Sequence, residues 1–269
     1  MTRKLYLLVL PLILAAQPQP PFTKQYLPVK PFEQAENERL LKLYEGLRVA
    51  DVNDGLDIAG LANVMMMDAG ILPMWRDEKG FRHRITGIAV TLRIVPAQGR
   101  TPDFPSHEAF AKWEGQWYSQ KTPEEFARWL SPGTVLVIDA HGTHDSGFCG
   151  SNNALNWTSR GMRGIVTSGG CRDSDENILQ RIPIYQRQYT RGINPGRVIV
   201  ESYNQPVSVG GVLVFPGDVV VADSDGVVVV PRAQAEKVAE AARKILEGDK
   251  KARRSLYEKT GRPLDHTVK

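Results

Sequence analysis

The 269-residue chain lacks three features, and each absence argues against a class of function. It lacks a charge excess: 34 basic and 30 acidic residues give +4, or +2 without Arg3 and Lys4, which is no nucleic-acid-binding footprint. Beyond its first residues, it lacks an apolar run long enough to span a bilayer. It also lacks a Gly-rich nucleotide loop of the Rossmann type, which argues against a nucleotide-dependent methyltransferase.

The first sixteen residues have the pattern of a signal peptide. Arg3 and Lys4 precede an apolar run, Leu5 to Ala16, that is too short to span a membrane and ends in small residues. We therefore expect residues 1–16 to be a signal peptide and the protein to be exported, to the periplasm or outside the cell. Leu14 is not the small residue preferred near a cleavage site, so a membrane-anchored protein with an uncleaved N-terminus is the alternative.

The remaining chain divides into an arm, one domain and a tail. Residues 17–35 are rich in Pro and Gln and predict an extended arm. Residues 36–262 mix helical and strand patterns and predict one α/β domain, with a tail at 263–269. Within the domain, residues 97–131 contain three tryptophans among prolines. This Trp-rich segment could cover a pocket or a neighbouring subunit, or only pack on the body of the domain.

Apolar periodicity predicts helices at 36–49, 152–160 and 232–247. Residues 84–93 predict a strand, and residues 198–231 are rich in strand patterns. Two segments, SPGTVLVIDAHG at 131–142 and FPGDVVVADSDG at 215–226, share a Pro-Gly turn, a buried strand and an Asp-containing turn. Asp139 and Asp223 occupy the same place in each copy, which favours a turn role for Asp139. A metal site at Asp139, His141, His144 and Asp145 is the weaker alternative.

The stretch Gly164 to Glu176, GIVTSGGCRDSDE, carries the candidate chemistry. Ile165 to Thr167 predict a short buried strand, and Gly169 and Gly170 stop it with a turn. Arg172 and Asp173 follow directly, where an open α/β sheet exposes reactive side chains. Arg suits a carboxylate, and Asp is a hard oxygen ligand for Mg²⁺ or Mn²⁺. On the dipeptide alone, a surface salt bridge beside a turn is the alternative interpretation.

The wider pattern resembles the RraA-like family, which includes class II 4-hydroxy-4-methyl-2-oxoglutarate aldolases and the RraA regulators of ribonuclease E. Its signature is a Gly, about twenty residues, Arg-Asp, two residues and an acid. Here Gly150 lies 22 residues before Arg172, and Arg172-Asp173-Ser174-Asp175-Glu176 completes the pattern. The resemblance covers about residues 36–262 and implies a swivelling αββα sandwich, with the Trp-rich segment as an insertion. It also implies a homotrimer or a hexamer.

The resemblance further implies a division of labour in a carbon–carbon lyase, an aldolase or a decarboxylase. Asp173 would hold a divalent cation, Mg²⁺ or Mn²⁺, mostly through water, and the reaction would pass through a metal-stabilised enolate. Arg172 would pair with the carboxylate or keto oxygen of a pyruvate-type 2-oxo acid. Gly150, Asn152 and Asn153 would bind the substrate at the start of the following helix, where backbone N–H groups can hold its carboxylate.

Ser151 departs from the family pattern, because the aldolases carry an acid after the Gly. Serine accepts a hydrogen bond but does not ionise near neutral pH. Another acid could fill the gap, the reaction could change, for example to decarboxylation, or catalysis could be lost, leaving a non-catalytic RraA-like binding or regulatory protein. A second acid in the aldolases comes from the C-terminal region of a neighbouring subunit, and Glu247 is the best-placed residue. The predicted catalytic residues are Ser151, Arg172, Asp173 and Glu247.

Two cysteines flank these motifs: Cys149 precedes Gly150 and Cys171 precedes Arg172. In an exported protein they could form a disulfide, because the family geometry brings the two segments together. Two free, half-buried thiols are the alternative.

Overall fold

The computed structural model describes residues 27, 29, 30 and 32–269. The predicted signal peptide at 1–16 and most of the predicted arm at 17–35 lie outside these residues. Within the described part of the chain, no helix is long and apolar enough to cross a membrane.

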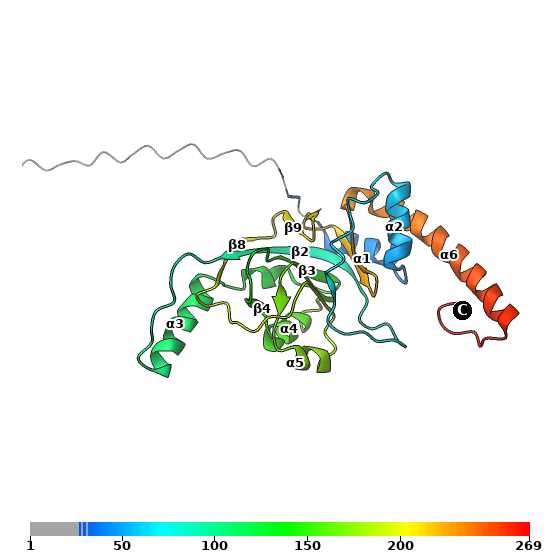
Figure 1. Ribbon diagram of the computed structural model, residues 1–269. Coiled ribbons are helices and arrows are strands. Elements are labelled where there is room, and N and C mark those ends of the chain that lie inside the picture. The colour runs from blue at the N-terminus through cyan, green and yellow to red at the C-terminus, as the bar shows by residue number, and fades with distance from the viewer. Residues whose placement is uncertain (1–26, 28, 31) are drawn as a thin grey trace, which may run out of the picture.

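A mixed β-sheet forms the centre of the molecule (Figure 1). In chain order the strands are β1 (Leu72–Pro73), β2 (Ile85–Pro96), β3 (Thr134–Asp139), β4 (Gly147–Cys149), β5 (Gly164–Thr167), β6 (Gly170–Cys171), β7 (Ile184–Gln186), β8 (Val198–Tyr203), β9 (Val207–Val209), β10 (Val212–Val214), β11 (Val219–Asp223) and β12 (Gly226–Val230). The main sheet has the order β1-β7-β5-β3-β2-β11-β12, in which β7, β5, β3 and β2 run parallel. The long β2 pairs with β3 along one edge, and with β11 and then β8 along the other. Outside the main sheet, β9 pairs with β10 and β4 pairs with β6.

The helices lie in three places around this sheet. They are α1 (Gln34–Leu43), α2 (Val49–Ile58), α3 (His107–Gln120), α4 (Ser151–Thr158), α5 (Ser174–Leu179) and α6 (Ala235–Thr260), with 3-10 turns η1 (Glu125–Trp129) and η2 (Arg232–Gln234). Figure 1 shows α4 and α5 together below the sheet, α3 beyond its left end, and α1, α2 and α6 at the right. The predicted α/β class is confirmed.

The strands are apolar on both faces because both faces are covered. In β3, Leu136 and Ile138 pack into a cluster with Trp157 of α4. The alternate residues, Val135 and Val137, pack into a second cluster with β9 and β10. Such two-sided burial is typical of parallel strands and explains their near-continuous apolar sequences. A third cluster joins α1, α2 and α6 to β11 and β12.

The two similar segments of the sequence become β3 and β11, which lie on opposite edges of β2. Asp139 Oδ1 accepts a hydrogen bond from His141 N at 3.3 Å, and Asp223 Oδ1 accepts one from Asp225 N at 2.9 Å. The predicted turn role of Asp139 is therefore confirmed.

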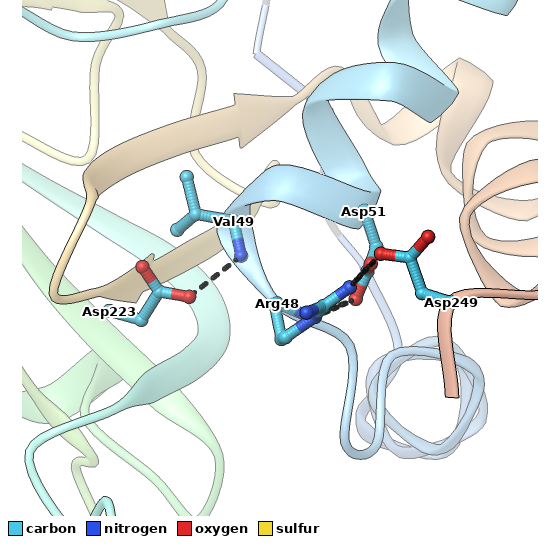
Figure 2. A network of polar contacts seen from close by, with 5 residues as sticks. All are labelled: Arg48, Val49, Asp51, Asp223 and Asp249. Atoms are coloured by element: carbon cyan, nitrogen blue, oxygen red, sulfur yellow. Dashed lines mark hydrogen bonds and ion pairs between the residues drawn. The ribbon is translucent and has the colours of Figure 1, made fainter. Parts of the chain in front are cut away.

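Asp223 also fixes the start of α2 (Figure 2). Its Oδ2 accepts from the N–H of Val49, the first residue of the helix, at 3.0 Å. Arg48 donates to Asp51 and, at 2.8 Å, to Asp249 of α6. Because these side chains come from the sheet and from both helices, they hold α2 between β11 and α6.

Two predicted helices have different bounds in the structure. The helix predicted at 36–49 is α1, which ends earlier, at Leu43, because the chain turns at Gly46 with φ +76°, a conformation that glycine adopts without strain. The helix predicted at 232–247 continues as α6 to Thr260 and ends at Gly261 with φ +68°. The helix predicted at 152–160 is α4.

Candidate active site

The turn after β5 leads into β6, and Arg172 and Asp173 follow this short strand directly. A side chain at Gly170 would collide with the carbonyl of Gln188, and a Cβ at Gly169 would lie 2.7 Å from Ala140 Cβ. Close approach of other chain segments, rather than positive φ, therefore requires the two glycines. Arg172 N donates to Cys149 O at 2.9 Å, so β6 brings Arg172 beside the end of β4.

Asp173 caps a helix other than the one it precedes. It has φ +56°, a left-handed conformation uncommon for a residue with a side chain. Its Oδ2 accepts from Ser151 N at 3.0 Å and lies 3.4 Å from Ser151 Oγ. Ser151 is the first residue of α4, whose N–H has no partner within its own helix. The carboxylate thus lies at the positive end of the α4 dipole.

Three polar side chains border the space that a side chain of residue 150 would occupy. A Cβ at this position would lie 2.7 Å from Asp173 Oδ2, 3.5 Å from Asn153 Oδ1 and 3.7 Å from Arg172 Nε. The φ of Gly150 is −98°, so its lack of a side chain, and not its conformational freedom, is what the site uses. Arg172 Nε lies 3.2 Å from Asp173 Oδ1. Both side chains remain about one-third exposed, at 33% and 34%, so a solute can reach them.

The structure brings together five of the predicted site residues: Gly150, Ser151, Asn153, Arg172 and Asp173. Their catalytic and binding roles stay predictions. Asn152 has an exposed side chain. The first hydrogen bond within α4 runs from Ala154 N to Gly150 O, so the backbone N–H of Asn152 has no acceptor within the helix.

Glu247 lies elsewhere in the molecule. It is an exposed residue of α6, which Figure 1 shows apart from α4 and α5. Its predicted role depends on a neighbouring subunit and stays a prediction.

Glu124 is the site residue that sequence reasoning missed. It lies between α3 and η1, and its Oε1 accepts from Asn153 Nδ2 at 2.6 Å. Its Oε2 accepts from Trp157 Nε1 at 2.9 Å. Asn153 and Trp157 are four residues apart on α4 and therefore share one face of the helix. The only sequence signal for such a residue was the serine at position 151, where the aldolases carry an acid. It did not indicate which other acid would lie nearby.

The two halves of the Trp-rich segment behave differently. In the first half, Phe104, Phe110, Trp113 and Trp117 form a chain of ring contacts, and α3 buries none of its residues. The second half enters the main core, where Phe126 is fully buried. The segment is thus partly a satellite cluster and partly core.

The C-terminal end of α3 comes within electrostatic range of the site. Partial burial raises the pKa of the Tyr118 phenol, the nearby carboxylates of Glu114 and Glu124 raise it further, and the positive charge of Arg172 opposes the rise. Tyr118 therefore belongs to the surroundings of Arg172.

Cys149 and Cys171 are fully buried neighbours in β4 and β6. Both are free, so the disulfide considered from sequence is not formed, and the expectation of half-buried thiols was wrong. Burial raises the pKa of the Cys149 thiol, and its hydrogen bond to Cys171 and the charges of Asp173 and Glu124 raise it further. A thiol kept neutral in this way is a poor nucleophile.

The donors at the site suit a hydrated hard cation rather than a closed metal cage. In the described part of the chain, no group of three or more His, Cys, Asp or Glu residues could hold a metal. The alternative site around His141 and His144 is not supported, because Asp145 pairs with Arg191 at 3.0 Å. Asp173 offers carboxylate oxygens, and Mg²⁺ commonly binds through one or two carboxylates together with water and substrate oxygens. Asp173 would be the protein ligand in such a site.

A polar groove of about 570 Å³ lies elsewhere, where β2, β3 and β5 end. Its charges are already paired: Arg187 with Asp68 at 2.7 Å, and Arg93 with Asp139 at 3.7 Å. This pairing makes the groove a weaker candidate than the space at Gly150.

Comparisons with known proteins agree with this geometry. A family model described as RraA-like, Aldolase/RraA, matches residues 49–229. A Halalkalibacterium halodurans protein named "Putative 4-hydroxy-4-methyl-2-oxoglutarate aldolase" is 34% identical over 126 residues, which are 47% of this chain and 60% of that protein. A Deinococcus radiodurans protein of the same name is 29% identical over 157 residues, which are 57% of this chain and 81% of that protein. The matched part thus spans about three-fifths of the first relative.

The fold also agrees with a solved structure. The crystal structure of Streptomyces coelicolor RraAS2, described as an unusual member of the RNase ES inhibitor RraA protein family, has a TM-score of 0.66 at 25% identity. The match covers 81% of this chain and 98% of that one. The predicted fold type is therefore confirmed, and the chain belongs to the RraA-like (Aldolase/RraA) family.

Proposed function

We propose that the protein is a divalent-metal-dependent carbon–carbon lyase that acts on a pyruvate-type 2-oxo acid. The observation that carries this proposal is the arrangement at Gly150, where the partly exposed side chains of Arg172 and Asp173 meet at the N-terminus of α4. The curated relatives named as aldolases support the same reaction class.

The positive groups at the site are suited to a carboxylate. Arg172 uses Nε toward Asp173, and its two terminal nitrogens carry four further N–H donors for a substrate anion. The N–H groups of Asn152 and Asn153 lie at the N-terminus of α4, which favours negative charge. The substrate carboxylate and 2-keto oxygen would therefore be oriented by Arg172 and the first turn of α4.

The reaction needs stabilisation of an enolate. Asp173 would hold a divalent cation, whose positive charge would lower the energy of this enolate. In the aldol branch, a base removes the 4-hydroxyl proton, the C3–C4 bond breaks, and its electron pair stays on C3, which is then protonated. Pyruvate and a carbonyl compound result. In the decarboxylation branch, the C3–C4 bond breaks to release CO₂, its electron pair stays on C3, and protonation of C3 gives pyruvate; no hydroxyl proton has to be removed.

Ser151 bears on the choice between these branches. Its hydroxyl does not ionise near neutral pH, so it cannot supply the negative charge that an acid at this position would bring to proton removal. Decarboxylation of a 2-oxo acid such as oxaloacetate requires no base for a hydroxyl proton, so the lack of an acid at position 151 hinders it less. We expect it to be faster than cleavage of 4-hydroxy-2-oxo acids.

The assay is release of pyruvate from 4-hydroxy-4-methyl-2-oxoglutarate and oxaloacetate by the purified protein with Mg²⁺ or Mn²⁺. We expect activity that EDTA abolishes and that added metal restores. Asp173→Ala should lower kcat/KM by about a hundredfold or more, because the proposed metal ligand is lost. Activity that persists in EDTA, or an active Asp173→Ala variant, would contradict the proposed chemistry.

A non-catalytic binding protein is the second candidate. Asp173 already interacts with Ser151 and Arg172, and Ser151 replaces the expected acid, so the site could bind an acid without converting it. The export proposed from residues 1–16 would separate the chain from a ribonuclease inside the cell. Pyruvate binding without turnover of either 4-hydroxy-4-methyl-2-oxoglutarate or oxaloacetate would favour this candidate.

A further inference from the structure

The Asn153 side chain lies between two carboxylates. Its Nδ2 donates to Glu124 Oε1 at 2.6 Å. Its Oδ1 lies 3.5 Å from the position that a Cβ of residue 150 would occupy, and Asp173 Oδ2 lies 2.7 Å from the same position. Among the described residues, no donor reaches Asn153 Oδ1, so this oxygen and Asp173 Oδ2 border one space.

Glu124 determines which way the Asn153 amide is turned. A carboxylate only accepts hydrogen bonds, and an indole N–H only donates. Trp157 Nε1 donates to Glu124 Oε2 at 2.9 Å, which leaves Oε1 for Asn153. The Asn153 amide must therefore turn its NH₂ group to Glu124, because the opposite orientation would place two oxygens in repulsive contact. Its oxygen then faces the space at Gly150.

We propose that Glu124 is a positioning residue that holds the Asn153 oxygen toward the substrate. Together with Asp173, this oxygen accepts a hydrogen bond from a substrate hydroxyl group or from water held over Gly150. The inference rests on the proposed function, since it supplies an acceptor where Ser151 lacks the usual carboxylate. The negative charge lies on Glu124, one hydrogen bond further from the substrate, and polarises the Asn153 amide.

The variant Glu124→Gln tests this role because it reverses the amide without removing a hydrogen bond. The Gln oxygen can accept from Trp157, which leaves its NH₂ group facing Asn153. The Asn153 amide then has to turn, so that its oxygen accepts from Gln and its NH₂ group faces Gly150. We expect the melting temperature to stay within about 3 °C of wild type. We expect kcat/KM for pyruvate release and the affinity for pyruvate with Mg²⁺ to fall about tenfold or more.

The double variant Glu124→Gln/Asn153→Asp should restore what the single variant loses. The Gln NH₂ group then donates to one Asp oxygen, and the other oxygen again faces Gly150 as an acceptor. We expect kcat/KM and pyruvate affinity within about threefold of wild type. Asn153→Asp alone places a carboxylate against Glu124, and the like charges should lower both activity and melting temperature. This pattern of rescue is not expected of a residue that only braces α4.

Two measurements separate failure of this inference from failure of the proposed function: turnover, and calorimetric titration with pyruvate and Mg²⁺. An active wild type with an unchanged Glu124→Gln variant would overturn the positioning role and leave the lyase function intact. A wild type without turnover that binds pyruvate, with loss in Glu124→Gln and rescue in the double variant, would support the positioning role and reject the reaction. Parallel loss of stability and activity without rescue would overturn it, as would a wild type that neither binds nor converts any probe.

Discussion

At the residue scale, the Asp173 carboxylate links two parts of the site. It satisfies the free N–H of Ser151 at the start of α4 and faces the space over Gly150. A left-handed residue with a side chain costs of order 1–2 kcal/mol, and the contacts on both sides of the turn offset that cost. The backbone strain and the reactive group thus coincide at one residue.

Gly150→Ala should remove function with a limited loss of stability. The new methyl group would lie 2.7 Å from Asp173 Oδ2, so the carboxylate must move and its bond to Ser151 N weakens. We expect a loss of about 1–2 kcal/mol in unfolding free energy and about a hundredfold in kcat/KM. Gly115→Ala on α3 is the matched control, because a methyl group there meets nothing within 4 Å. Wild-type kinetics for Gly150→Ala would show that the space is not used.

Asp218 should make stability fall as pH rises. Burial raises its pKa to about 6, whereas the pKa of an unfolded Asp is about 3.9. Between these values the folded state binds more protons, so ionisation of Asp218 lowers the unfolding free energy from pH 4 to pH 6. Relative to Asp218→Asn, the wild type should lose about 2–3 kcal/mol over this interval, measured by urea unfolding. Curves that stay parallel would show that Asp218 is ionised throughout.

The sequence predicted Arg172 and Asp173 but not Glu124, and the difference has a physical reason. Arg172 and Asp173 directly follow a short apolar strand and a Gly-Gly turn, so local patterns were enough to place them at a strand end. Glu124 reaches Asn153 and Trp157 only because the Trp-rich segment folds back onto α4, a contact between residues about thirty positions apart. No local pattern contains that information.

At the element scale, the same contrast appears in the helices. The apolar periodicity of α6 ends where the helix leaves the body, and its exposed part contains pairs such as Arg254 with Glu258 at 3.0 Å. Periodicity detects burial, so it predicted the buried half and missed the exposed continuation. The periodicity also placed the end of α1 too late, at Val49, because it does not show the left-handed turn at Gly46.

The contact between α2 and α6 depends on the absence of a side chain at Gly55. A Cβ there would lie 2.8 Å from Val238 O and 3.3 Å from Ala242 N, both backbone atoms of α6. Because the backbone cannot move unless the helices separate, we expect Gly55→Ala to lower unfolding free energy by about 1–3 kcal/mol, despite better helix propensity. Gly248→Ala on α6 meets nothing within 4 Å and should instead add about 0.5–1 kcal/mol. Equal melting temperatures for the two variants would contradict this account.

At the scale of the whole molecule, α4 and α5 carry exposed apolar side chains. Leu155 on α4 is 50% exposed and Leu179 on α5 is 81% exposed, so two contacting helices, one of which begins next to Asp173, present apolar side chains to solvent. Glu247 lies on α6, apart from them. We propose that a neighbouring subunit of a homotrimer or hexamer covers α4 and α5 and supplies its Glu247.

Mixed oligomers test this shared site directly. Asp173→Asn and Glu247→Gln should each be inactive alone, because every site in either oligomer lacks one carboxylate. When the two chains are co-expressed in equal amounts with different tags, a site is complete if its own chain has Asp173 and its neighbour has Glu247. Random assembly makes about a quarter of all sites complete. Tandem purification removes the uniform oligomers, so purified mixed trimers should recover about a third of wild-type activity and mixed hexamers about a quarter. Light scattering should give three or six chain masses for each sample. Mixed oligomers without activity, or a fully active Glu247→Gln variant, would assign the second acid elsewhere, and a monomeric mass would exclude a shared site altogether.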